Sequence, residues 1–183
     1  MVKQDSQPVV LTVGHSTRTL DEFIALLAAH SVSRLIDVRT VPRSRHNPQF
    51  NRDTLPAALE AAGIRYAHVA GLGGFRHTHP GSLNMGWRNV SFRGYADYMQ
   101  TPEFADNLAG LIEQAKRERI ALMCAEAVPW RCHRSLISDA AVARGVPVLH
   151  ILDSGTEGHQ LTSFGRVESG RVRYDAAPQN ELF

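Results

Sequence analysis

Short apolar runs rich in branched residues alternate along the chain with segments of helical periodicity. The apolar runs, which we predict to be buried strands, span residues 9–13, 34–38, 66–70, 120–124 and 146–152. The helical patterns between them span residues 20–30, 53–63, 94–99, 102–118 and 133–145. Because parallel strands need crossover connections, this alternation predicts an α/β domain with a mainly parallel sheet of about five strands.

Capping and turn residues support these boundaries. Thr19 and Glu22 have the spacing of a capping box at the start of the first helix. Gly63 and Gly145 stand where glycine commonly ends a helix. Near the C-terminus, residues 163–175 (SFGRVESGRVRYD) predict a β-hairpin that turns at its central Ser-Gly pair.

The 183 residues are expected to form a single domain. We divide it into a flexible N-terminus at 1–8, an α/β core at 9–152 and a C-terminal extension at 153–183, which holds the hairpin. Residues 71–93 are polar, glycine-rich and without a clear period, which predicts a lid or binding loop. Parallel sheets bind ligands outside the carboxyl ends of their strands, so we sought site residues in the loops that follow each strand.

Charge becomes informative once the basic residues are separated. The chain has 20 basic and 18 acidic residues, and every basic residue except Lys3 and Lys116 is arginine. Arginine suits carboxylate and phosphate ligands, although a GC-rich genome would produce the same bias. The polar first residues, the absence of a long apolar run and the presence of only two cysteines predict a cytoplasmic protein with no export signal and no membrane partner.

The loops after the first three strands carry candidates for ligand binding. His15 and Ser16 precede a helix start, where hydroxyl and N–H groups can hold an anion, although Ser16 could instead only shape the turn. Asp37 lies in an apolar strand and needs a partner, for which Arg39 and Arg43 are candidates; alternatively, it caps a neighbouring loop. Two further candidates, in the long loop and at the helix after it, are Arg76 and Tyr95.

The loop after the fourth strand holds the densest group of reactive side chains. Cys124 ends the strand, Glu126 follows it, and Cys132, His133 and Arg134 open the next helix. A cysteine at a helix start beside basic side chains can act as a thiolate nucleophile, and Cys132 fits this description better than Cys124. Either cysteine could instead be a small buried apolar residue, and this alternative applies more to Cys124 than to Cys132.

Four kinds of chemistry are compatible with this loop. Binding of phosphate or carboxylate by loop amides and Arg134 is the preferred hypothesis, and nucleophilic catalysis by Cys132 is the second. A redox pair of Cys124 and Cys132 would have a spacing that matches no CxxC motif. Zinc ranks last and no metal is predicted, because adjacent Cys132 and His133 are expected to point in different directions and no familiar ligand spacing is present.

Six motifs stand out along the chain, in the order GHSTRTLDEF, IDVRTVPRSRHNPQFN, LGG, FRGYADYM, CAEAVPWRCHRSLI and VLHIL. Together they resemble the domain of unknown function family 488 over nearly the whole chain. The resemblance implies a Rossmann-like, three-layer α/β fold and supplies neither an activity nor a cofactor. The positions that it singles out are His15, Ser16, Asp37, Arg39, Pro42, Arg43, Cys124, Glu126, Cys132, His133 and Arg134.

The leading functional hypothesis is an enzyme that acts on a small anionic or nucleotide-like ligand at the carboxyl ends of the strands. Arg39, Arg43 and Arg134 would hold the ligand. The predicted catalytic residues, for covalent or acid–base steps, are Cys132, Glu126 and His133. The alternatives are a nucleic-acid-binding or regulatory module that uses the basic, aromatic-containing loops, and a structural or partner-binding protein.

Overall fold

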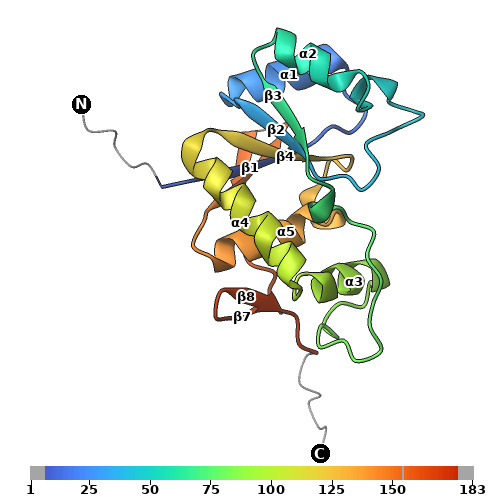
Figure 1. The fold of residues 1–183 in the computed structure, drawn as a ribbon, viewed down its shortest axis with the longest axis vertical. Helices are drawn as coiled ribbons and strands as arrows, with labels where there is room; N and C mark the ends of the chain where they lie inside the picture. The colour runs from blue at the N-terminus through green and yellow to red at the C-terminus, as the bar shows by residue number, and fades with distance from the viewer. Residues whose placement is uncertain (1–6, 154, 177–183) are drawn as a thin grey trace, which may run out of the picture.

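A six-stranded sheet forms the centre of the molecule (Figure 1). The computed structural model describes residues 7–153 and 155–176. Within them the sheet has the order β3-β2-β4-β1-β5-β6, with β6 antiparallel and every other pairing parallel. Its strands are β1 (Val10–Gly14), β2 (Arg34–Asp37), β3 (Arg65–His68), β4 (Ile120–Cys124), β5 (Val148–Leu152) and β6 (Gly155–Gly158). The predicted α/β class is therefore confirmed, with one strand more than expected.

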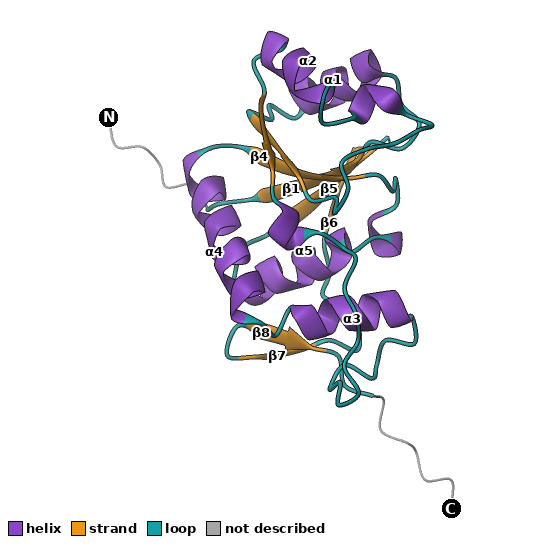
Figure 2. Ribbon diagram, turned by 45° about the vertical axis from the view of Figure 1, so that its right-hand side comes forward, coloured by secondary structure: helices purple, strands orange, loops and turns teal. Residues whose placement is uncertain are grey.

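Helices cover both faces of the sheet, so that the chain forms three layers (Figure 2). The first two helices lie on one face and the other three on the opposite face (Figures 1 and 2). The helices are α1 (Leu20–Ala29), α2 (Leu55–Ala61), α3 (Val90–Tyr98), α4 (Pro102–Arg117) and α5 (Arg134–Ala143). Short 3₁₀ turns are η1 (Pro48–Phe50), η2 (Ala70–Leu72) and η3 (Pro129–Arg131). Each face has its own apolar core.

The local signals of the sequence form as predicted. The Thr19 hydroxyl accepts the N–H of Glu22, whose carboxylate in turn accepts the N–H of Thr19. The hairpin strands β7 (Arg166–Glu168) and β8 (Arg171–Arg173) pair antiparallel. Ser169 and Gly170 between them have φ of 50° and 73°, which are the left-handed values that a type I′ turn requires.

Some boundaries differ from expectation. The third strand was predicted at 66–70 as a buried strand; β3 instead lies at the sheet edge, so it is only partly buried, and the chain enters η2 at Ala70. The helix predicted at 94–99 begins earlier, at Val90, because Asn89 caps it. Most of the flexible N-terminus expected at 1–8, and the end of the C-terminal extension, lie outside the described residues. No helix of the described chain has the length and apolar character needed to span a bilayer.

The register of the central strands brings three loops together. Gly14 at the end of β1 pairs with Cys124 at the end of β4. Asp37 at the end of β2 pairs with Met123 on the other side of β4. The carboxyl ends of β1, β4 and β2 are therefore level, and the loops that follow them share one edge of the sheet.

Candidate functional site

A cavity of about 390 Å³ opens at this edge of the sheet. Its walls come from the loops after β1, β2 and β4, and from the segments around residues 74–75 and 91–92. Seven of the residues singled out from the sequence line it: His15, Arg39, Arg43, Cys124, Glu126, Cys132 and His133. The side chains gathered there include two thiols, two imidazoles and a carboxylate.

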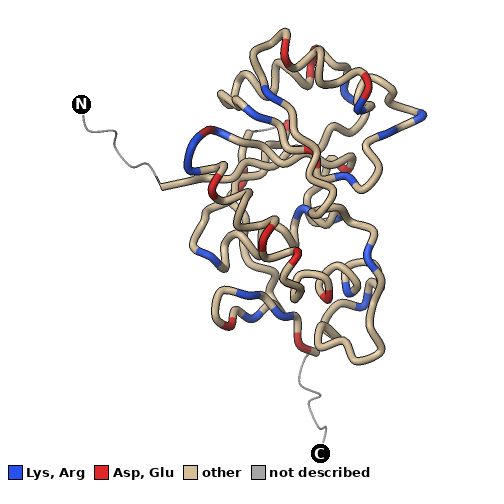
Figure 3. Tube along the Cα trace, in the orientation of Figure 1, with Lys and Arg blue, Asp and Glu red and all other residues tan. Residues whose placement is uncertain are grey.

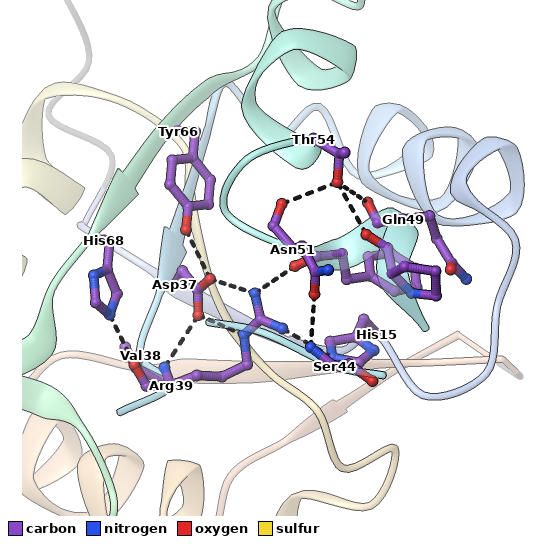
Figure 4. A network of polar contacts seen from close by, with 12 residues as sticks. His15, Asp37, Val38, Arg39, Ser44, Gln49, Asn51, Thr54, Tyr66 and His68 are labelled. Atoms are coloured by element: carbon purple, nitrogen blue, oxygen red, sulfur yellow. Dashed lines mark hydrogen bonds and ion pairs between the residues drawn. The ribbon is translucent and has the colours of Figure 1, made fainter. Parts of the chain in front are cut away.

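A buried ion pair fixes the loop after β2 (Figure 4). The Arg39 guanidinium donates to both carboxylate oxygens of Asp37, at 2.9 Å and 2.6 Å, and to the carbonyl of Phe50 at 2.7 Å. Tyr66 donates its hydroxyl to the same carboxylate at 2.8 Å. Of the two partners proposed for Asp37, Arg39 is thus the correct one, whereas exposed Arg43 lies 3.6 Å from Asp53.

His15 stands beside this ion pair as a neutral imidazole. Its Nδ1 lies 2.8 Å from the Ser16 carbonyl, which can only accept, so Nδ1 carries the proton. Its Nε2 therefore accepts from Arg39 Nη1 at 3.3 Å, and the ring stacks on Phe50 with centroids 4.3 Å apart. Burial, with the Arg39 charge adding to it, lowers the pKa of His15 to about 4.

Cys124, Cys132 and His133 form a compact cluster on the cavity wall. Their two sulfur atoms and one imidazole nitrogen all lie within 4.8 Å of one another. The expectation that Cys132 and His133 point in different directions is wrong, because Cys132 Sγ lies 3.6 Å from His133 Nδ1. Cys132 has an extended backbone and His133 a helical one, and this change between neighbours turns both side chains to the same side.

The pKa values of the two thiols in the cluster are shifted in opposite directions. The hydrogen bond between them, in which Cys124 is the donor, raises the pKa of Cys124, and burial adds to this rise. The same hydrogen bond, together with the Arg134 charge and N–H group, lowers the pKa of Cys132 to about 7 against the effect of burial. Cys132 also accepts the Arg134 N–H at 3.4 Å, at the start of α5.

Arg134 holds the loop after β4 from the inside of the molecule. Its side chain is 1% exposed, and its guanidinium donates to the Thr12 hydroxyl at 3.1 Å and to the Glu126 carbonyl at 2.5 Å. The same carbonyl packs against Gly14, where a Cβ atom would overlap it. The loops after β1 and β4 thus meet backbone to backbone, and Arg134 is engaged by internal oxygens rather than presented to the cavity.

The remaining predicted residues also lie outside the cavity lining, and they position its walls. Arg76 stacks over the Tyr98 ring, with Cζ 3.6 Å from the centroid. Tyr95 is fully buried, donates its hydroxyl to the Leu72 carbonyl at 2.9 Å and packs against the His133 ring. The predicted site residues outside the lining are Ser16, Asp37, Arg76, Tyr95 and Arg134.

Sequence reasoning missed several lining residues. Arg131 lies in η3, immediately before Cys132, and its charge in the WRCHR run was a signal that could have identified it. Val41, Phe75 and Phe92 give the cavity an apolar side, and Phe75 is 79% exposed. Of these three, only Val41 was missed, because Phe75 and Phe92 belong to the aromatic-containing loops of the nucleic-acid alternative. An exposed phenylalanine in a glycine-rich loop is a signal of the same kind. The other lining residues not singled out are Thr40, Ser44, Gly74, Ser91 and Ala125.

A family model described as "Domain of unknown function DUF488" matches residues 19–141. The matched segment runs from the cap of α1 into α5 and includes the loops that carry the Asp37–Arg39 pair and the two cysteines. No curated protein and no solved structure matches the chain significantly. Because the match covers more than half of its residues, the chain belongs to the DUF488 family.

Proposed function

We propose that this protein is an enzyme that binds a small anionic ligand in the cavity and attacks it with the Cys132 sulfur. The observation that carries the proposal is the position of Cys132. Cys132 lines the cavity, and its sulfur accepts the backbone N–H of Arg134 at the start of a ten-residue helix, where thiolate is favoured. The Cys124 sulfur and a ring nitrogen of His133 both lie within 4.8 Å of the Cys132 sulfur.

The walls of the cavity suit a ligand that has a charged end and an apolar end. Arg131 and Arg43 line it with exposed guanidinium groups, which suit phosphate or carboxylate. Arg39 adds a third positive charge, although Asp37 already neutralises it. The apolar side at Phe75 and its neighbours would contact the rest of the ligand, as a nucleotide-like molecule requires.

The chemistry assigned to the site is a nucleophilic displacement. Cys132 Sγ would form a bond to an electrophilic centre of the ligand, and the leaving group would depart with its bonding electron pair. Glu126 is exposed at the cavity and is the group that we assign to donate a proton to the leaving group. Water would then attack the same centre and give a proton to the Glu126 carboxylate, and the bond to sulfur would break with its electron pair returning to Cys132 as thiolate.

Cavity size and charge distribution favour this function over nucleic-acid binding. A volume of about 390 Å³ is in the range of small-molecule sites, which is about 300–1,000 Å³. Acidic and basic positions are interspersed along the part of the chain that the structure describes (Figure 3), and the net charge is +2. Extended duplex binding depends on many phosphate contacts from one basic face.

Alkylation with two reagents that differ in charge tests the proposal. Iodoacetate carries a carboxylate and iodoacetamide a neutral amide, and peptide mass spectrometry locates the modified sulfur. We expect Cys132 to react first. Its ratio of iodoacetate to iodoacetamide rates should exceed that of glutathione about fivefold or more, because one favourable charge pair is worth about 1 kcal/mol or more. Inorganic phosphate should slow the iodoacetate reaction.

Two arginine variants sharpen this experiment. Arg131→Gln should reduce the preference for iodoacetate, whereas Arg88→Gln, which changes an exposed arginine outside the cavity lining, should leave it unchanged. An unreactive Cys132, or the reagent preference of a free thiol in the unmodified protein, would contradict the proposal.

A further inference from the structure

We propose that Cys124, Cys132 and His133 form a binding site for one zinc-class divalent metal ion. The inference goes beyond the proposed function, because a bound ion would occupy the sulfur that reacts and would hold the enzyme inactive. Thiolate and imidazole are the ligands that zinc prefers in proteins. Within the described chain this is the one cluster of three such groups with all ligand atoms within 4.8 Å.

The distances in the cluster fit tetrahedral coordination. Zinc binds sulfur at about 2.3 Å and imidazole nitrogen at about 2.0–2.1 Å, so adjacent S and N ligands of a tetrahedron are about 3.6 Å apart. Cys132 Sγ and His133 Nδ1 are 3.6 Å apart. Two sulfur ligands would be about 3.8 Å apart on the same basis. Cys124 Sγ, within 4.8 Å of both other atoms, would reach this separation by a small side-chain adjustment.

The surroundings of His133 aim its free nitrogen at the cluster. Its Nε2 lies 2.9 Å from the Val38 carbonyl, which can only accept, so Nε2 carries the proton and Nδ1 presents a lone pair. A backbone carbonyl on the second nitrogen is the usual arrangement of a metal-binding histidine. The glycine at position 74 keeps side-chain atoms away from His133 Nδ1, because a Cβ atom on residue 74 would lie 2.7 Å from this nitrogen.

The proposed site is open on one side. Three protein ligands leave the fourth tetrahedral position free, and all three residues line the cavity. Water or a ligand anion from the cavity would complete the coordination, as in three-ligand zinc sites. Binding would displace the protons of the two thiols, so one ion enters as the thiol protons leave. Both sulfur atoms would then be held by the metal, and neither could attack a ligand.

Metal titration of the purified full chain tests the inference. Co²⁺ should produce thiolate-to-metal charge-transfer absorption and the intense visible bands of tetrahedral coordination, and Zn²⁺ should abolish both at one ion per chain. Cys124→Ser and His133→Ala should each weaken binding by about 100-fold or more, beyond the loss typical of outer-shell changes. His46→Ala removes an exposed histidine outside the cavity lining and should not change the affinity.

A second readout does not depend on variants. One equivalent of Zn²⁺ should protect Cys132 of the unmodified protein from iodoacetamide, and a chelator should restore the reaction. Absence of protection, or equal metal affinity after Cys132→Ser, would overturn the inference. The outcomes separate the two proposals: anion-selective alkylation without zinc protection would overturn only the metal site, and zinc binding without anion selectivity would overturn only the proposed function.

Discussion

Replacing Asp37 by asparagine would remove the negative charge that balances a buried guanidinium. Asp37 is fully buried and Arg39 is 6% exposed, so solvent cannot take over the role of the carboxylate. Breaking a buried ion pair from one side typically costs about 3–5 kcal/mol. Asparagine keeps one oxygen that can still accept a hydrogen bond, so we expect a loss at the lower end, about 3 kcal/mol. For a chain of this size that corresponds to a fall in Tm of about 6–12 °C.

Urea unfolding followed by circular dichroism would measure this loss. The matched control is Asp153→Asn, because Asp153 pairs with Arg18 and its side chain is 87% exposed. An exposed ion pair contributes about 1 kcal/mol or less, so the control should unfold at nearly the wild-type midpoint. A loss below about 1 kcal/mol for Asp37→Asn, or equal losses in the two variants, would refute the argument that burial makes this pair essential.

Two further changes follow from the packing and protonation of the scaffold. Gly14→Ala should lower the free energy of unfolding by about 1–3 kcal/mol, because the added Cβ would overlap the Glu126 carbonyl. Gly110→Ala, in open space on α4, should be neutral or slightly stabilising. Equal urea midpoints for the two variants would contradict this. Burial lowers the pKa of His150 from 6.5 to about 4, so between these pH values the unfolded chain binds a proton that the folded chain does not. Stability should therefore fall as pH drops from about 6.5 to about 4, by at most about 3 kcal/mol from this group. A His150→Gln variant that shows the same pH dependence in urea titrations would refute the assignment.

Most of the fold could be predicted because its signals are local. Buried strands and amphipathic helices have their own periodicities, and caps and turns use few residue types. Strand β6 gave no such signal: its sequence GTEG has no apolar pattern, every residue is exposed, and it joins the sheet through backbone pairing with β5. The Asp37–Arg39 pair could be anticipated for a different reason, since a carboxylate in an apolar strand is too costly to leave without a partner.

The directions of individual side chains were beyond the reach of sequence reasoning. Arg134 and Arg131 are equally basic, yet Arg134 donates from both Nη atoms to internal oxygens, whereas Arg131 lines the cavity. Which of them can meet an anion depends on where α5 begins. The convergence of Cys132 and His133 depends in the same way on two successive backbone conformations that no residue type enforces.

The C-terminal extension is coupled to the site by a buried chain of hydrogen bonds. Asp139 on α5 accepts from the hydroxyl of Tyr174, just after β8, at 2.7 Å and pairs with His159 at 2.8 Å. His159 and His150 are 2.9 Å apart, and His150 is 2.7 Å from the Thr12 hydroxyl. The chain ends at Arg134, which donates to Thr12 and also holds the loop that carries the cysteines.

One proton arrangement satisfies every link of this chain. Because Arg134 can only donate to Thr12, the Thr12 hydroxyl is free to donate to His150 Nδ1. His150 then carries its proton on Nε2 and donates to His159, which donates from its own Nε2 to Asp139. Both histidines are neutral in this arrangement, in agreement with the lowered pKa of His150. Protonation of His150 would add a proton at Nδ1, so the Thr12 hydroxyl, which already accepts from Arg134, would have to turn its own proton away and accept from His150 as well.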